Sequence, residues 1–327
     1  MNRTIDWESR IGRRLRLRDL HIFFAVVQSG SMAKAATHLR VKQPSVSRAI
    51  GDLEAALGVR LLDRSTRGVE PTIYGDALLK CGVAAFDDLR QGIRTIEFLS
   101  DPTAGELRIA CVASAAAMIV PSAVHSFAQT YPRAVVHVDE AALPSQLAGL
   151  RDRKYDFGIT RLGSPLPGEL QDLTVDILLD DRFVVAAGNH NRWARRRQID
   201  LAELVDAPWI LAAPNTGNYS FLADAFRERG LGMPKATLVT LSLHIVAQLL
   251  ANGEYVTAFP RSWVRFNSLK ILPVNLPVRP CPLAILTLKN RTLSPVVGRF
   301  IENVRKAVQS FAKPQSRAAQ LPKSNVS

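Results

Sequence analysis

Apolar residues near the start of the chain recur at helical spacing. One face of the first predicted helix carries Leu17, Leu20, Phe24 and Val27. Gly30 lies where this pattern breaks, and an alanine-rich stretch over 32–39 predicts a second, short helix that another helix can cross closely. A third helix is predicted over 44–57, because Pro44 suits a first helical turn and Gly58 suits the residue after a helix end.

The third predicted helix has two distinct faces. At 100° per residue, its apolar side carries Val46, Ile50, Leu53 and Leu57. The opposite side is small and polar, and carries Pro44, Ser45, Ser47, Arg48, Gly51 and Asp52. Such a face fits a DNA major groove about 12 Å wide and brings short hydrogen-bonding groups to the base edges. Two helices joined by a tight turn, the second with this face, predict a helix-turn-helix.

The segment over 59–72 predicts a β-hairpin wing. Two short apolar stretches flank a basic turn that contains Arg64 and Arg67 and ends at Gly68. Both arginines can reach DNA phosphates or a minor groove from such a turn.

A long helix is predicted over 73–99, with Thr72 as its cap. Its apolar residues repeat at the spacing of a helix–helix seam, and are Leu79, Phe86, Leu89, Ile93 and Ile96. Gly82 is a blemish in this seam. The seam predicts a helix–helix dimer, and the alternative is packing against the chain's own domain. Residues 100–105 contain proline and glycine and predict a hinge.

The remaining two thirds of the chain alternate predicted strands and helices. The strands are 107–112, 135–139, 157–160, 183–187, 209–212, 238–240, 255–259 and 284–288, and the helices are 115–130, 144–153, 218–230, 242–252 and 294–311. This alternation predicts parallel sheets with right-handed crossovers, which bind ligands at the carboxyl ends of their strands. The expected fold class is therefore α/β, preceded by an all-α winged helix-turn-helix.

The charge of the chain favours a polyanionic partner. The 327 residues include 42 Lys and Arg against 29 Asp and Glu, which gives a formal net charge of +13. Residues 1–72 hold 13 basic and 7 acidic residues, so almost half of the excess lies on the helix-turn-helix region. With 47% hydrophobic residues, the composition excludes a mostly disordered protein, a collagen and a coiled-coil rod.

The sequence carries no motif of catalysis or metal binding. The six histidines form no ligand pattern, and no nucleophile elbow, phosphate loop or dinucleotide motif occurs. Cys81, Cys111 and Cys281 lie far apart, which favours reduced thiols over the alternative of a redox switch between Cys111 and Cys281. We therefore expect no catalytic residue, no metal and no cofactor. No apolar stretch reaches the ~20 residues of a membrane span, so we expect a cytoplasmic protein without a membrane partner.

Five sequence blocks make the chain resemble the LysR-type transcriptional regulators. They occur in order and at the family's spacing, over 20–27, 30–36, 43–54, 57–64 and 71–75. Thr72 and Gly75 fit the Thr-x-x-Gly that the family has after its wing. Weaker landmarks continue to residue 311. The resemblance implies a long linker helix, followed by an effector domain similar to periplasmic binding proteins, with two α/β subdomains and a cleft between them.

The resemblance also assigns roles to single residues. Those that match the family's groove and phosphate contacts are Gln43, Pro44, Ser45, Ser47 and Arg48. The residue that matches the family's minor-groove contact is Arg67, and the linker helix is the family's homodimerisation element.

The expected limits are 1–16 for a basic extension, 17–72 for the DNA-binding domain, 73–99 for the linker helix, 100–105 for the hinge, 106–311 for the effector domain and 312–327 for a tail. Within the effector domain, we expect subdomain I over about 106–178 and 283–311, and subdomain II over about 179–282.

Strand ends and helix starts supply the candidate effector site. The candidates are Ser114, Thr160, Arg161, Asn215 and Thr216. Two helix N-termini that face a cleft favour an anionic group such as a carboxylate, so we expect a small organic acid or oxygenated metabolite. The alternative for each residue is capping or turn chemistry.

The expected function is sequence-specific regulation of transcription. The expected partners are double-stranded promoter or operator DNA, a small effector, and further copies of the chain in a homodimer or homotetramer. The arginine run over 192–197 is read as a solvated loop or, alternatively, as a contact for an acidic partner such as RNA polymerase. Rival functions are an α/β enzyme, or a ligand-binding protein, with an accessory nucleic-acid-binding arm.

Overall fold

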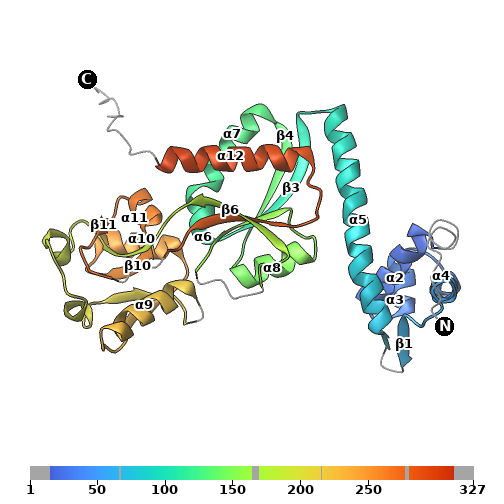
Figure 1. Ribbon diagram of the computed structural model, residues 1–327, viewed down its shortest axis with the longest axis horizontal. Helices are drawn as coiled ribbons and strands as arrows, with labels where there is room; N and C mark the ends of the chain where they lie inside the picture. The colour runs from blue at the N-terminus through green and yellow to red at the C-terminus, as the bar shows by residue number, and fades with distance from the viewer. Residues whose placement is uncertain (1–14, 66–67, 164–168, 215, 277–279, 313–327) are drawn as a thin grey trace, which may run out of the picture. The chain divides into compact units, whose positions relative to one another are not determined.

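The chain folds into two compact units, Met1–Arg90 and Gln91–Ser327. The computed structural model describes residues 15–65, 68–163, 169–214, 216–276 and 280–312. Figure 1 labels many of the elements of each unit, and the boundary between the units falls within helix α5 (Ile73–Ser100). None of the helices in the described ranges is long and apolar enough to cross a membrane.

The first unit is a helix-turn-helix with a β-hairpin wing. It contains α2 (Leu17–Ser29), α3 (Met32–His38) and α4 (Gln43–Leu57), and an antiparallel pair of β1 (Leu62–Ser65) and β2 (Gly68–Pro71). The apolar faces meet in one core, in which Phe23, Val26, Val46, Ile50 and Leu53 are fully buried. The pattern of apolar residues is enough to produce this arrangement, because each helix has one apolar stripe to bury.

Thr72 and Gly75 join the wing to α5. The Thr72 hydroxyl donates to the Arg60 carbonyl at 2.8 Å and accepts from the Gly75 N–H at 3.2 Å. A Cβ atom on Gly75 would lie 2.2 Å from the Leu61 carbonyl oxygen, so only glycine allows this approach. The Thr-x-x-Gly pattern therefore packs the start of α5 closely against the wing.

Gly82 lets α5 approach the helix-turn-helix core. A Cβ atom there would lie 2.3 Å from the Phe24 ring, and Phe86 meets the same ring edge-on at 5.4 Å. Reading Gly82 as a blemish in the seam was therefore wrong. Leu79 and Phe86 pack within the first unit, whereas Leu89, Ile93 and Ile96 are 47%, 57% and 65% exposed.

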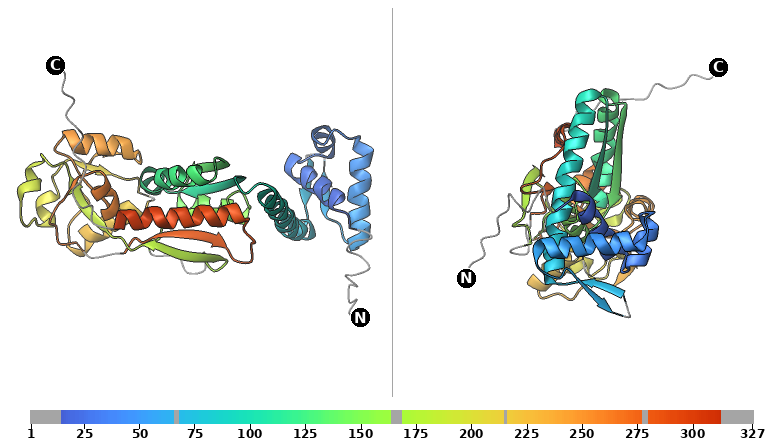
Figure 2. Two further views of the ribbon diagram at one scale, coloured as in Figure 1. Left: turned by 90° about the horizontal axis from the view of Figure 1, so that it is seen from above. Right: turned by 90° about the vertical axis from the view of Figure 1, so that its right-hand side faces the viewer.

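The second unit contains two five-stranded sheets. The first has the order β4-β3-β5-β12-β6, with β3 (Ala104–Cys111), β4 (Arg133–Glu140), β5 (Phe157–Arg161), β6 (Leu173–Leu179) and β12 (Leu283–Leu288). The helices of this lobe, lobe I, are α6 (Ala113–Met118), α7 (Val120–Thr130), α8 (Leu143–Arg151) and α12 (Pro295–Ala312). α12 lies along α7 over one face of the sheet, and α8 lies on the other (Figures 1 and 2).

The second sheet forms lobe II and has the order β11-β7-β10-β8-β9. Its strands are β7 (Phe183–Ala187), β8 (Trp209–Leu211), β9 (Ala236–Val239), β10 (Val256–Pro260) and β11 (Lys270–Ile271). Its helices are α9 (Gly217–Glu228), α10 (Leu243–Asn252) and α11 (Arg261–Phe266), with short 3₁₀ turns η1 (Arg192–Arg195) and η2 (Leu201–Leu204).

Both sheets are mixed, which corrects the prediction of parallel sheets. β3 is parallel to β4 and β5, but β12 is antiparallel to β5 and β6, and β7 is antiparallel to β10. The reason is that the chain crosses between the lobes twice. The chain leaves lobe I after β6 and returns to it in β12, so β12 is antiparallel to β6. In lobe II, the chain enters in β7, and β7 is antiparallel to β10, which ends beside the start of β7.

Other local predictions also need correction. The helix predicted over 115–130 is broken at Ile119, because Pro121 in the next turn lacks the N–H that a continuous helix needs. β6, β11 and α11 were not predicted, since both strands lie at sheet edges and a six-residue helix gives little periodicity.

A buried carboxylate attaches α5 to lobe I. Asp156, directly before β5, is 2% exposed and accepts from Arg94 Nη1 at 3.2 Å and from Arg291 Nη2 at 3.1 Å. The Arg108 backbone N–H of β3 donates to its other oxygen at 2.8 Å. One side chain thus binds the linker helix, a central strand and the segment that precedes α12.

Gln91 of α5 reinforces this attachment with both ends of its amide. Its Nε2 donates to Asp156 at 3.4 Å, and its Oε1 accepts from the Ser294 backbone N–H at 3.2 Å. Because Arg291 is 1% exposed, water cannot replace the Asp156 carboxylate as its partner.

We expect Asp156→Asn to destabilise the second unit by about 3–5 kcal/mol, because it leaves buried guanidinium charge without its counter-ion. Urea unfolding followed by tryptophan fluorescence measures this, since Trp193, Trp209 and Trp263 all lie in lobe II. The matched control is Asp176→Asn, which breaks an exposed pair with Arg305 and should cost less than about 1 kcal/mol. Equal losses in the two variants would contradict the assignment.

Candidate functional site

The predicted recognition face lies at the start of α4. Gln43, Pro44, Ser45 and Arg48 are exposed and Ser47 is partly exposed, whereas Val46 between them is fully buried. The structure therefore brings together on one surface all five residues that the family resemblance selected.

The N-terminus of α4 adds backbone donors to this surface. Its N-cap residue, Lys42, makes no side-chain capping bond. The first N–H groups of a helix lack helical acceptors, so an uncapped start can bind a phosphate oxygen. At the other end of α4, Glu54 accepts from the Leu61 and Leu62 N–H groups at 2.8 and 3.3 Å, which fixes the wing against the helix.

The wing presents Arg64 to solvent. Arg64 lies in β1 opposite Val69 of β2, and the burial pattern of β1 is one buried residue followed by three exposed ones. Arg67, the other predicted wing contact, lies outside the described residues.

A second candidate site lies where the lobes of the second unit meet. Arg161 ends β5 of lobe I, and its Nε donates to the Ser114 hydroxyl at 3.1 Å. Its Nη2 donates to the Ser262 hydroxyl of lobe II at 2.9 Å, and its Nη1 donates to Asp181 at 2.9 Å and to the Cys281 carbonyl at 3.1 Å. We call Ser114, Arg161, Asp181 and Ser262 the interlobe clasp.

Asp181 supplies the counter-charge of the clasp. The pair of Arg161 and Asp181 is 10% and 4% exposed. The same carboxylate accepts from the backbone N–H groups of Arg182, at 2.8 Å, and Ser262, at 3.3 Å. The prediction that Ser114 and Arg161 lie together is thus met by the geometry, but the guanidinium also has an internal partner.

Thr160 faces away from the clasp. Ile159 points into the core under α7 and α12, so the side chain of Thr160 points to the α8 face of the sheet. Gln146 of α8 lies on that face, and its Oε1 would be 2.7 Å from a Cβ atom on Gly158. Both Gln146 Oε1 and Thr160 Oγ1 are buried without a hydrogen-bond partner among the described residues.

The predicted pair in lobe II behaves differently. Thr216 is the N-cap of α9, and its hydroxyl accepts from the Tyr219 N–H at 3.4 Å and donates to the Ala213 carbonyl at 2.7 Å. This is the capping role that we weighed as the alternative. Asn215 lies outside the described residues.

Sequence reasoning missed Asp181, Ser262 and Gln146. Asp181 follows a strand that was not predicted, and Ser262 belongs to a helix that was not predicted. Two adjacent aspartates followed by an arginine, between apolar runs, were the available signal for Asp181. Gln146 carried none, because a single glutamine in a helix is usually solvated.

The buried cysteines are protected thiols. Burial raises the pKa of Cys111 and of Cys281 to about 12, so neither is a thiolate at neutral pH. This disfavours the alternative of a redox switch between them. Within the described residues no cluster of His, Cys, Asp and Glu could hold a metal ion.

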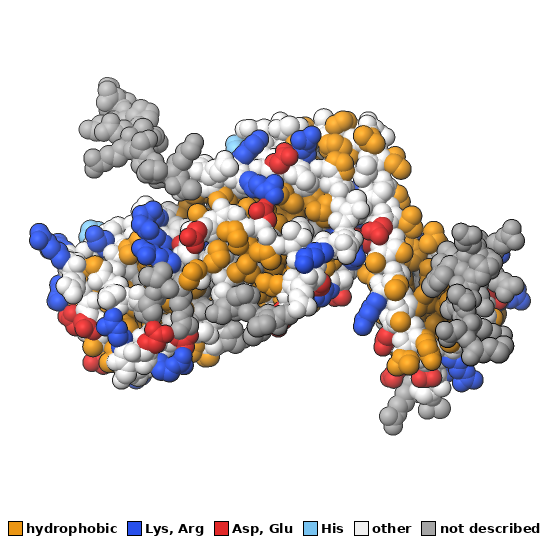
Figure 3. Space-filling model, in the orientation of Figure 1, with side chains coloured by type: hydrophobic (Ala, Val, Ile, Leu, Met, Phe, Trp, Pro, Cys, Tyr) orange, Lys and Arg blue, Asp and Glu red, His pale blue; other side chains and the backbone are white. Residues whose placement is uncertain are grey.

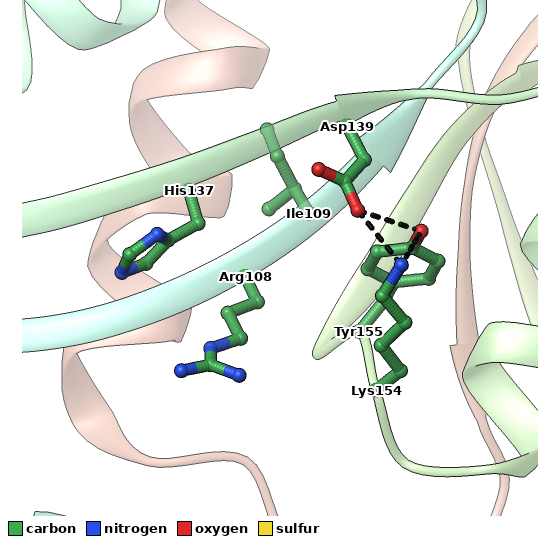
Figure 4. Close-up of a pocket in the computed structure, with 6 residues that line it drawn as sticks. All are labelled: Arg108, Ile109, His137, Asp139, Lys154 and Tyr155. Carbon is green, nitrogen blue, oxygen red and sulfur yellow. Dashed lines mark hydrogen bonds and ion pairs between the residues drawn. The ribbon is translucent and has the colours of Figure 1, made fainter.

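A surface pocket on lobe I uses none of the predicted residues. It encloses about 230 Å³ and is lined by Arg108, Ile109, His137, Asp139, Lys154 and Tyr155 (Figure 4). Lys154 donates to the Tyr155 hydroxyl at 2.8 Å, and that hydroxyl donates to Asp139 at 2.8 Å. Hydrogen bonds from Lys154 and Tyr155 lower the pKa of Asp139.

The other charged groups of this pocket are paired as well. Glu106 accepts from Arg108 at 2.8 Å and lies 3.2 Å from His137 Nε2. Since each charge has a counter-charge within the pocket wall, the pocket needs no ligand to satisfy it.

The arginine run over 192–197 is stacked on an indole ring. Arg192 and Arg196 lie 5.0 and 5.8 Å from the centroid of Trp193, and Arg196 also pairs with Glu203 at 3.0 Å. The run therefore begins in the 3₁₀ turn η1 at the surface, which fits the interpretation as a solvated loop.

Comparison with known proteins identifies both units. The family model described as bacterial regulatory helix-turn-helix protein, lysR family, matches residues 17–76, and the LysR substrate binding domain matches residues 100–309. The uncharacterized HTH-type transcriptional regulator YdcI of Escherichia coli (strain K12) is 28% identical over 310 residues, which cover 93% of this chain and 99% of that protein. The HTH-type transcriptional regulator TdfR of Cupriavidus pinatubonensis is 30% identical over 250 residues, or 76% of this chain and 83% of that protein.

Solved structures agree with this relation. The crystal structure of full-length BenM, an HTH-type transcriptional regulator of Acinetobacter baylyi, has a TM-score of 0.51 and 25% identity, and the match covers 92% of this chain and all of that chain. The two family models, the helix-turn-helix with its wing, and the two-lobed α/β unit together show that the chain belongs to the LysR family of DNA-binding transcriptional regulators and is not an enzyme.

Proposed function

We propose that the protein acts in the cytoplasm as a homodimer or homotetramer on promoter DNA and responds to a small, oxygenated acid bound between its lobes. The observation that carries the effector part is the interlobe clasp. One guanidinium from lobe I bonds the hydroxyls of Ser114 in lobe I and Ser262 in lobe II. A ligand that competes for these bonds changes how the lobes are held together, which is what a ligand-dependent switch requires.

The proposed division of labour in DNA binding follows from exposure and chemistry. Gln43 and Ser47 offer amide and hydroxyl groups on the recognition face, and these can distinguish base edges. Arg64 on the wing offers charge, which attracts every phosphate equally.

The chemistry around the cleft supports an oxygenated acid. The carboxylate of such a ligand can accept the hydrogen bonds that Arg161 Nε and Nη2 give to the two serine hydroxyls, while Nη1 keeps its bond to Asp181.

The exposed half of the seam supports oligomerisation through α5. Leu89, Ile93, Ile96 and Leu99 are 47–73% exposed. Figure 3 shows hydrophobic side chains along the exposed length of this helix. A long helix with such a stripe buries it against another helix, and a second copy of the chain offers the same stripe.

We expect Gln43→Ala and Ser47→Ala to reduce the preference for the cognate site over random DNA, at about 1–3 kcal/mol per lost base contact. Arg64→Ala should instead weaken binding to both DNAs by a similar factor and flatten the salt dependence. Fluorescence anisotropy with the gene's own upstream DNA and a scrambled duplex, across a salt series, measures both effects. A uniform loss in all three variants would overturn this division.

We expect a thermal-shift screen of small carboxylic and hydroxy acids to yield ligands that stabilise the full chain. Ser114→Ala and Ser262→Ala should each weaken such a ligand by about tenfold, since the hydroxyl that Arg161 releases donates one hydrogen bond to the bound carboxylate. Ser220→Ala, an exposed serine of α9, is the control and should bind normally. Unchanged affinity in both clasp variants would place the ligand elsewhere.

We expect Ile93→Asp to dissociate the oligomer, because a charge in an apolar seam must be desolvated. Light scattering after size exclusion measures the mass, and circular dichroism should report unchanged helix content. Ile93→Leu is the matched control and should retain the oligomer. If Ile93→Asp keeps the native mass, α5 is not the interface.

A further inference from the structure

The DNA-binding unit does not account for all of the positive charge. Residues 179–282, which make up lobe II, hold 12 basic and 8 acidic residues. Figure 3 shows basic side chains gathered on this lobe. DNA contacts of the recognition helix and wing give no reason for this excess, so its local arrangement is informative.

Three arginines converge where the chain passes from lobe I to lobe II. Arg182 directly precedes β7, and its carbonyl accepts from the Arg261 backbone N–H at 2.9 Å. Arg265 follows Arg261 by four residues in α11, so the two side chains share one face of that helix. Residues from two chain segments thus place three guanidiniums around one spot, which we call the crossover arginine cluster.

No acid forms an ion pair with this cluster in the described part of the chain. Neither a hydrogen bond nor an ion pair joins the guanidinium of Arg182, Arg261 or Arg265 to any acid in the described part of the chain. The nearby carboxylate of Asp181 is 4% exposed and is already bonded to Arg161 and to the backbone of Arg182 and Ser262. Asp181 therefore bonds to Arg161 and to the backbone, and it offsets the charge of the three arginines only from a distance.

The arrangement carries an electrostatic cost that the fold does not need. Arg261 is partly buried, and burial followed by the charges of Arg265 and Arg182 lowers the pKa of its guanidinium, against a smaller opposing effect of Asp181. Like charges four residues apart on a helix destabilise it slightly. Uncompensated like charges are typical of binding sites, where the ligand supplies the missing charge.

We propose that the crossover arginine cluster binds a phosphate dianion, either inorganic phosphate or the phosphate group of a small metabolite. Two negative charges on a compact tetrahedral group match several guanidiniums better than a single carboxylate does. A small anion is favoured over the backbone of a nucleic acid, because Arg261 is partly buried and a rod-like polyanion reaches exposed side chains first.

The position of the site gives the anion a route to the interlobe clasp. Asp181 bonds the backbone N–H groups of Arg182 and Ser262, and these residues either carry the cluster or adjoin it. A phosphate that draws Arg182 toward Arg261 and Arg265 therefore stabilises the same backbone that holds Asp181 against Arg161. The cluster is a second ligand site, separate from the proposed effector site and independent of whether that site is occupied.

The test is titration of the full chain with inorganic phosphate near neutral pH, at an ionic strength held constant with chloride, by calorimetry and by thermal unfolding. We expect saturable binding and a rise in the unfolding temperature, with sulfate acting similarly. Arg182→Ala and Arg265→Ala should each weaken binding by about tenfold, as expected for the loss of one charge-assisted contact. Arg195→Ala removes the same charge from an exposed arginine of lobe II and should bind phosphate normally.

Three results would overturn the proposal. The first is the absence of saturable phosphate binding. The second is equal affinity in all variants, or an equal loss in Arg195→Ala, which would indicate a diffuse effect of net charge. The third is a loss of affinity for random duplex DNA in Arg265→Ala without phosphate binding by the parent chain, which would make this surface a DNA contact. Arg182 and Arg265 are exposed, so their replacement should leave the unfolding temperature without phosphate unchanged. Measuring that temperature checks that each variant is folded.

Discussion

The buried carboxylate of Asp156 is the contact on which the second unit depends. Two guanidiniums, one amide and one backbone N–H converge on it from helix α5, strand β3 and the segment before α12. A carboxylate is costly to bury unless its oxygens accept hydrogen bonds, and here the donors come from elements far apart in sequence. The linker helix is therefore fixed to the second unit by electrostatics as well as by apolar packing.

Strand β5 connects this attachment with the lobes. Asp156 directly precedes the strand and Arg161 ends it, and the residues between them are fully or almost fully buried. The two charged ends lie five residues apart, or about 17 Å in an extended strand. One rigid strand thus carries the anchor of α5 at one end and the guanidinium that joins both lobes at the other.

The charge of the chain has two different roles. On the first unit it surrounds an uncapped helix N-terminus and a wing, and this is the footprint of DNA binding in a LysR-family regulator. On lobe II it is partly neutralised, as where Arg196 meets Glu203, and partly uncompensated, as in the crossover arginine cluster. Net charge alone does not separate these cases, because pairing depends on residues that are distant in sequence.

The outcome for individual residues shows how far sequence reasoning extends. The helix-turn-helix and the polar face of α4 followed from local patterns and from the family motifs, and Ser114 and Arg161 became candidates through their positions at a helix start and a strand end. The role of Gly82 was misjudged, because its lack of a side chain makes room for the Phe24 ring. Phe24 is distant in sequence, so no local pattern around Gly82 reveals this contact. Thr160 lies at the strand end where it was predicted, but its side chain points away from Arg161 and the clasp. The reason is that alternate residues of a strand point to opposite faces of the sheet.

The sequence by itself determined the local elements and the DNA-binding face, because helical periodicity, capping and turn residues act over a few positions. Only the tertiary structure decided the direction of β12 and β7, the counter-ion of Arg161 and the convergence on Asp156. These depend on the two crossings between lobes, which bring together charges up to 135 residues apart. The physical reason is that pairing of buried charge is set by proximity in space, and sequence spacing does not encode that proximity.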